Sequence, residues 1–103
     1  MRRGDLWTLS DTEAVVVIGS NRLAENDFPV TYVLPLHAVA PNGLEPPFVV
    51  KLTPTATGLA VPTWAHPYAL RTVAVADLKQ KLGLLNDKAI RQVDGALRDL
   101  LQL

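Results

Sequence analysis

The 103-residue chain contains no cysteine, so it can form neither a disulfide framework nor a thiolate metal site. This composition fits a reducing compartment, and any bound metal would need histidine or carboxylate ligands. The chain also lacks an apolar run as long as a signal-sequence core or a membrane span. We therefore expect a cytoplasmic protein that does not associate with membranes.

An excess of positive charge is missing as well, because ten basic residues balance ten acidic ones. Nucleic-acid affinity depends strongly on phosphate neutralisation, so the balance counts against an extensive nucleic-acid surface. An enzyme that contacts a few nucleotides needs only a local cluster of cations, and dimerisation can bring two clusters together. The candidate cations are Arg2, Arg3, Arg22, Lys51 and Arg71.

Apolar residues make up 49% of the chain, enough for a modest core in a single domain over residues 1–103. The continuous β-branched run at Ala14–Ile18 predicts a strand that is covered on both faces, near the centre of a sheet. Similar but weaker patterns predict further strands at residues 6–9, 30–36, 48–52, 59–63 and 69–75. Polar and helix-breaking residues predict loops or turns at residues 20–29, 37–47 and 53–58.

The pattern of apolar residues changes near the C-terminus. Asp77 can cap a short helix that runs through Leu82 and ends at Gly83, and Asn86 can cap a final helix. Apolar residues then recur at three- and four-residue steps, at Ile90, Val93, Leu97, Leu100 and Leu101. We expect a mainly β fold whose C-terminal amphipathic helix closes the core.

Two sets of motifs carry a resemblance to a known family. Gly4-Asp5-Leu6-Trp7 opens the chain, while Leu70-Arg71-Thr72-Val73, Asp77-Leu78 and Gly83 precede the final helix. With these motifs the chain resembles the MazF/PemK toxins over its whole length. The resemblance implies a small SH3-like barrel of the CcdB/PemK type and a homodimer held in check by a cognate antitoxin. It also implies a metal-independent endoribonuclease, without a cofactor, that cleaves single-stranded RNA by 2′-hydroxyl attack and leaves a cyclic phosphate.

The sequence departs from this family at two places. Thr12-Glu13 stands where family members commonly carry an Arg-Pro pair, whose arginine stabilises phosphate charge. The loop that covers the substrate in the family is shortened here to Ser10–Glu13. These departures keep two alternatives open: a non-catalytic, CcdB-like toxin that binds a protein target, and an inactive partner subunit.

Both histidines of the chain fall at positions that resemble active-site positions of the family. His37 follows Leu34-Pro35-Leu36, where relatives tend to carry Thr or Ser, and His66 lies where some relatives place an active-site arginine. Imidazole titrates near neutrality and can transfer protons. We hypothesise that His37 and His66 form an acid and base pair, with Arg71 or Arg22 as the phosphate partner. The alternative is that His37 caps a strand and that His66 is an ordinary loop residue.

The resemblance also suggests RNA-binding residues. Ser20-Asn21-Arg22 follows the central strand where the family often has Ser-Asn, and these side chains can support the site by hydrogen bonds. Thr72 and Arg71 lie on a predicted strand, where an ion pair or a satisfied barrel residue is the favoured alternative to a direct role.

Aromatic residues flank His66 in a proline-containing segment. If exposed, Trp64 and Tyr68 can stack on the bases of single-stranded RNA. For Trp64, packing at the mouth of the barrel is the more favoured interpretation. Glu13 is interpreted as a turn residue that can pair with Arg22.

Overall fold

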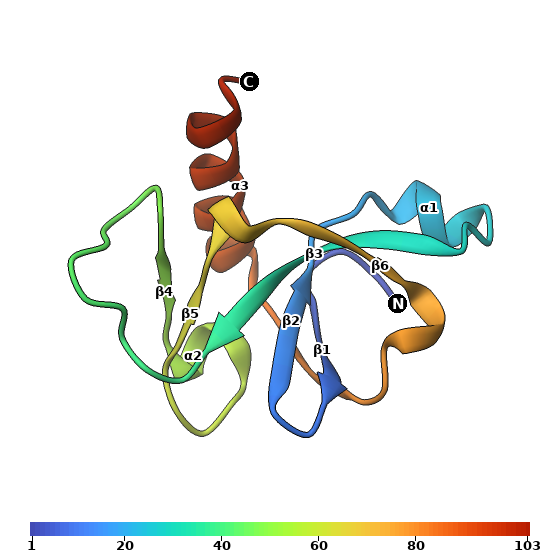
Figure 1. Ribbon diagram of the computed structural model, residues 1–103, viewed down its shortest axis with the longest axis horizontal. Coiled ribbons are helices and arrows are strands. Elements are labelled where there is room, and N and C mark those ends of the chain that lie inside the picture. The colour runs from blue at the N-terminus through green and yellow to red at the C-terminus, as the bar shows by residue number, and fades with distance from the viewer.

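A curved antiparallel sheet carries one long helix against one of its faces, as Figure 1 shows for a computed structural model that describes residues 1–103. The strands are β1 (Asp5–Ser10), β2 (Glu13–Val17), β3 (Val30–His37), β4 (Val50–Leu52), β5 (Thr63–Ala65), β6 (Arg71–Ala74) and β7 (Lys81–Leu84). The helices are α1 (Asn21–Glu25), α2 (Pro54–Thr57) and α3 (Asp87–Leu101), with 3-10 turns η1 (Pro67–Ala69) and η2 (Val75–Asp77). No helix combines the length and the apolarity that crossing a membrane requires.

The long strand β3 organises the sheet. The strand order is β4-β5-β3-β2-β1-β7, and β6 also pairs with β3. β2 lies along one edge of β3, while β6 and β5 share its other edge: β6 pairs with the first half, up to Val33, and β5 with the last two residues, Leu36 and His37. This half-barrel with a C-terminal helix matches the mainly β fold class predicted from the sequence.

Each face of the sheet carries its own apolar cluster, because successive residues of a strand point to opposite sides. On one face, Leu6, Val16 and Leu34 pack with the buried side of α3 in a core of twelve residues. On the other face, a smaller core consists of Val15, Val17 and Val33, with Trp7, Leu9 and Val73 packed against it. β2 is thus covered on both sides, which confirms the prediction from its β-branched run.

The final helix begins where the sequence predicts. The Asn86 side chain accepts a hydrogen bond from the Ala89 N–H at 2.9 Å and so caps α3. Val93 and Leu97 are buried in the larger core, whereas Leu101 remains 56% exposed. The apolar face of α3 therefore closes the core along most, but not all, of its length.

The prediction of a helix over Asp77–Leu82 is wrong. Only the 3-10 turn η2 forms there, and the chain continues into β7, which pairs with β1. Gly83 does not end a helix but lies within β7, where a Cβ atom would be 2.6 Å from the carbonyl oxygen of Thr57. A glycine inside a strand often marks such a close approach of another backbone segment.

Smaller differences concern the ends of other elements. The strand expected at residues 59–63 is instead β5, at Thr63–Ala65, because Pro62 has no N–H to donate to a strand ladder. The segments expected as loop 20–29 and turn 53–58 each contain a short helix, capped by the side chains of Ser20 and Thr53. The remaining predicted strands are present, with ends that differ by at most two residues.

Candidate active site

A row of side chains crosses the C-terminal end of β3 on the face of the smaller core. His37 pairs with Trp64 of β5, and Trp64 pairs with Lys51 of β4. On the other edge of β3, Ala14 of β2 pairs with Leu36. The next residue along each strand is Glu13 and His37, so these two lie beside each other. Directly paired residues share a face of the sheet, so Lys51, Trp64, His37 and Glu13 form one row across four strands.

The imidazole rings of His37 and His66 meet at this row. Their centroids are 4.4 Å apart and the rings are nearly perpendicular, at 87°. The backbone N–H of His66 donates a hydrogen bond to the carbonyl of Pro35 at 3.1 Å, which holds the segment after β5 against β3. The structure therefore brings together the two histidines that were expected to form a pair.

The two rings differ in their surroundings. His37 is exposed, whereas His66 is only 7% exposed. His66 Nδ1 lies 3.3 Å from the hydroxyl of Tyr68, while its buried Nε2 has no hydrogen-bond partner in the protein. Burial, and secondly the neighbouring His37, lowers the pKa of His66 below its ordinary value of 6.5. His66 is therefore uncharged at neutral pH and can accept a proton.

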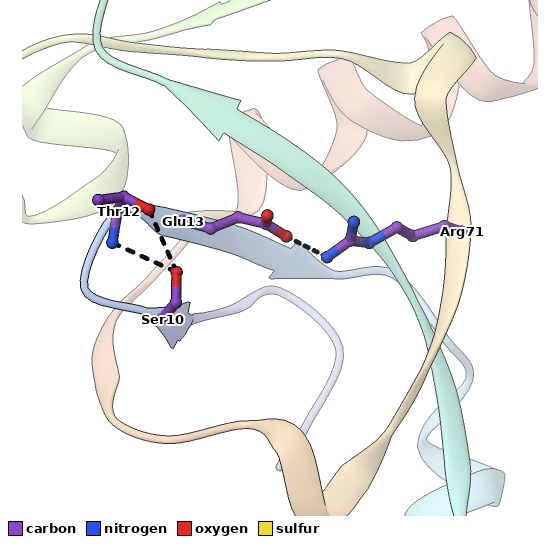
Figure 2. A network of polar contacts seen from close by, with 4 residues as sticks. All are labelled: Ser10, Thr12, Glu13 and Arg71. Atoms are coloured by element: carbon purple, nitrogen blue, oxygen red, sulfur yellow. Dashed lines mark hydrogen bonds and ion pairs between the residues drawn. The ribbon is translucent and has the colours of Figure 1, made fainter.

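Figure 2 shows an ion pair between Glu13 of β2 and Arg71 of β6, which extend toward each other over the face of β3. Both side chains are partly exposed, at 40% for Glu13 and 47% for Arg71. Arg71 was predicted at the site, but the pairing of Glu13 with Arg22 was wrong, and Glu13 begins β2 rather than lying within a turn. The guanidinium keeps further N–H donors on this face of the sheet.

The connection between β1 and β2 is short and tied by side chains. The Ser10 hydroxyl accepts a hydrogen bond from the Thr12 N–H at 3.3 Å and lies 3.4 Å from the Thr12 hydroxyl (Figure 2). Beside it is a cavity of about 260 Å³ whose lining includes Glu13, His37 and Leu59. As predicted, the long loop that covers the substrate in the family is replaced here by a short hairpin at Ser10–Glu13. His37 beside it is open to solvent.

Comparison with known proteins identifies the family. The profile of the PemK-like, MazF-like toxins of type II toxin–antitoxin systems matches residues 2–101. The chain belongs to this family. The assignment confirms the resemblance seen in the sequence, although no curated protein sequence matches the chain.

Solved structures of similar fold agree with the assignment. An endoribonuclease from a mycobacterial species has a TM-score of 0.84 at 14% identity, covering 100% of this chain and 92% of that chain. The Mycobacterium tuberculosis toxin MazF-mt6 has a TM-score of 0.78 at 19% identity, covering 98% of each chain. A MazE–MazF complex from Deinococcus radiodurans has a TM-score of 0.77 at 18% identity, covering 99% of this chain and 96% of that chain. At these identities the likeness establishes the fold.

In this PemK-like chain, Ser20, Asn21 and Arg22 lie away from the histidines. The Gly19 N–H donates to the carbonyl of Tyr32, five residues before His37 on β3 and so roughly 17 Å from it. The side chain of Ser20 caps α1, and that of Asn21 accepts from the Arg3 N–H at 2.7 Å. The structure does not bring these three predicted RNA-binding residues to the histidine pair of the same chain.

Of the other residues predicted to bind RNA, Tyr68 joins the pair and Thr72 does not. Tyr68 is 56% exposed, and its ring stands nearly perpendicular to that of His66. Thr72 pairs with Tyr32 and follows Arg71 along β6, so its side chain points to the face opposite that of Arg71.

No group of three or more histidine and acidic side chains is placed to hold a metal ion.

Proposed function

We propose that this PemK-like toxin is an endoribonuclease that cleaves single-stranded RNA by attack of a 2′-hydroxyl on the adjacent phosphate. The contact between His37 and His66 carries the proposal, because it places two proton-transfer groups on the face of the sheet that also carries the Glu13–Arg71 ion pair. Structural relatives named as endoribonucleases support it.

The different exposures of the two histidines suggest a role for each. His66 is too buried to touch RNA, but the exposed Tyr68 hydroxyl can take the proton of the 2′-hydroxyl while it passes its own proton to His66 Nδ1. The 2′ oxygen then bonds to phosphorus, and the bond from phosphorus to the 5′ oxygen of the next nucleotide breaks. His37, in its protonated form, gives a proton to that leaving oxygen. The step therefore leaves His66 with one proton more and His37 with one proton fewer.

Arg71 stabilises the charge that builds up on the phosphoryl oxygens. A guanidinium presents five N–H donors in a fixed plane, so an ion pair with Glu13 leaves donors for phosphate. Arg71, on β6, takes over the phosphate-binding role of the arginine that relatives carry before the central strand. Electrostatic stabilisation of this kind is usually a large contribution to catalysis.

The proposal also covers the oligomeric state, cofactor requirement and partner of the enzyme. Residues 1–103 act as a single cytoplasmic domain that forms a homodimer and needs no metal ion or other cofactor. A cognate antitoxin covers the site; one structural relative is described as an endoribonuclease in complex with its cognate antitoxin.

The test is to incubate the purified protein with mixed-sequence single-stranded RNA in the presence of EDTA and to analyse the cut ends. Products should carry a 2′,3′-cyclic phosphate. His37→Ala and His66→Ala should each lower the cleavage rate by at least about 100-fold, the usual contribution of general acid–base catalysis. Arg98→Gln, on the exposed side of α3, should cleave at the original rate. Intact RNA after incubation with folded protein would overturn the proposal and favour a protein-binding toxin or an inactive partner subunit.

A further inference from the structure

We infer that Lys51 and Trp64 form a nucleotide-binding subsite beside His37, in which the indole stacks on a base and the ammonium binds the neighbouring phosphate. The inference rests on the proposed function, because it takes single-stranded RNA as the ligand. It extends the site from the reacting phosphate to the next nucleotide along the strand.

The sheet register sets the spacing of this subsite. Trp64 is the direct partner of His37, and Lys51 is the direct partner of Trp64. Neighbouring strands are roughly 4.8 Å apart, so the backbone at Lys51 lies roughly 10 Å from that at His37. Because all three side chains share one face, a strand of RNA held at His37 can continue over Trp64 toward Lys51.

Lys51 has a charge that no carboxylate neutralises. Its ammonium lies 5.9 Å from the centre of the Trp64 ring, and no acidic oxygen is within ion-pair distance. By contrast, Arg3, Arg71 and Lys81 are all engaged in ion pairs. The contact with the indole holds the ammonium near the ring without cancelling its charge, which leaves it free for a phosphate.

Trp64 is placed for stacking rather than for packing. It is only partly buried, while its neighbours Thr63 and Ala65 are buried, and it belongs to neither hydrophobic core. The other tryptophan, Trp7, packs against the smaller core. Packing at the mouth of the barrel, the interpretation favoured from the sequence, therefore does not explain why the Trp64 ring is partly exposed and outside both cores. Stacking on an aromatic ring accepts any base, so we expect this subsite to add affinity rather than sequence selection.

The test measures binding separately from cleavage. The probe is a pool of mixed-sequence 2′-O-methyl hexanucleotides, which have no free 2′-hydroxyl and cannot be cut by the proposed chemistry. Trp64→Leu should weaken binding roughly 5- to 150-fold, the range found for loss of a stacked base. Lys51→Gln should weaken binding and reduce the slope of log K against log salt concentration by about 0.7, the value for one phosphate contact with a single strand. Tryptophan fluorescence of the wild type should change on binding, and this change should disappear in Trp64→Phe.

Two matched variants serve as controls. Phe28→Leu removes an exposed aromatic ring before the start of β3, at the end opposite His37, and Arg98→Gln removes a cation from the exposed side of α3, outside the cavities that Lys51 lines. Both should bind the pool as the wild type does, with an unchanged salt slope.

The outcomes separate this inference from the proposed catalysis. If the wild type binds the pool through Trp64 and Lys51 but cleaves no RNA, the subsite stands and the catalytic proposal fails. If the wild type cleaves RNA while Trp64→Leu and Lys51→Gln bind as well as the controls, the subsite is wrong. A wild-type protein that binds no member of the pool would overturn the subsite, while the cleavage assay alone decides the catalytic proposal.

Discussion

Glu13 and Arg71 are 58 positions apart in the sequence and form an ion pair over the face of β3 (Figure 2). The pair exists because β2 and β6 lie on opposite edges of that strand. A carboxylate therefore sits against the cation that we assign to the phosphate, in a place where the family commonly carries an Arg-Pro pair. From the role proposed for Arg71, we expect Glu13 to compete with the RNA phosphate for its guanidinium.

Removal of this competition should strengthen RNA binding. Glu13→Gln should tighten binding of the 2′-O-methyl pool up to about fivefold, because exposed ion pairs contribute up to about 1 kcal/mol. Asp11→Asn removes a negative charge from the same hairpin without touching Arg71 and should have a smaller effect. Weaker binding by Glu13→Gln would mean instead that the glutamate orients Arg71.

The Tyr68 hydroxyl should be required for chemistry and not for binding. Tyr68→Phe keeps the ring but removes the group that passes a proton to His66, so the cleavage rate constant should fall about 100-fold with little change in KM. The double variant Tyr68→Phe with His66→Gln should be no slower than the slower single variant, because both residues act in one transfer. Additive losses would contradict the relay.

His66 should make the folded protein sensitive to acid. Burial and the nearby His37 lower the pKa of His66 in the folded state, while the unfolded chain has the ordinary value of 6.5. Below pH 6.5 the unfolded state therefore binds more protons, and the free energy of unfolding should fall as the pH drops; above 6.5 the contribution is constant.

Urea unfolding of the wild type and His66→Gln at a series of pH values measures this contribution. The difference between the two should be constant at neutral pH and should change in acid, in the direction that favours the variant. His37→Gln should show a smaller acid sensitivity than the wild type, because it removes the second cause of the shift. Parallel curves for wild type and His66→Gln would contradict the assignment.

Gly83 and Gly95 should respond in opposite ways to the same substitution. An added Cβ at Gly83 would lie 2.6 Å from the backbone oxygen of Thr57, so Gly83→Ala should destabilise the fold by roughly 1–3 kcal/mol. At Gly95, within α3, nothing lies within 4 Å of an added Cβ. Gly95→Ala should stabilise the protein by up to about 1 kcal/mol, because alanine favours the helix. Urea denaturation measures both, and equal effects would contradict the packing argument.

Local patterns in the sequence were sufficient for much of the fold. The β-branched run at β2 predicts a strand covered on both faces, and the Asn86 cap with the apolar period of α3 predicts the terminal helix. The periodicity of apolar residues gave the wrong prediction, a helix, at β7, because four residues are too few to distinguish a strand from a helical turn. The pairing of β7 with β1, which is set by tertiary contacts, decided that segment.

For the candidate site, the sequence provided the residues but only part of the arrangement. The positions of His37 and His66 relative to family motifs predicted their proximity. The partner of Glu13 and the row from His37 to Lys51 depend on which strands lie side by side, and no local pattern encodes that order. The burial that lowers the pKa of His66 likewise arises only when the segment after β5 folds back on Pro35.

The central strand β3 has one further consequence. It contributes Leu34 to the larger core and Val33 to the smaller one, and it carries His37 at its end. His37, which we propose as a reactive group, therefore sits at the end of a strand that both cores hold in place rather than on a flexible loop. On heating, we expect enzymatic inactivation and cooperative melting to occur at the same temperature, with no earlier loss of the site.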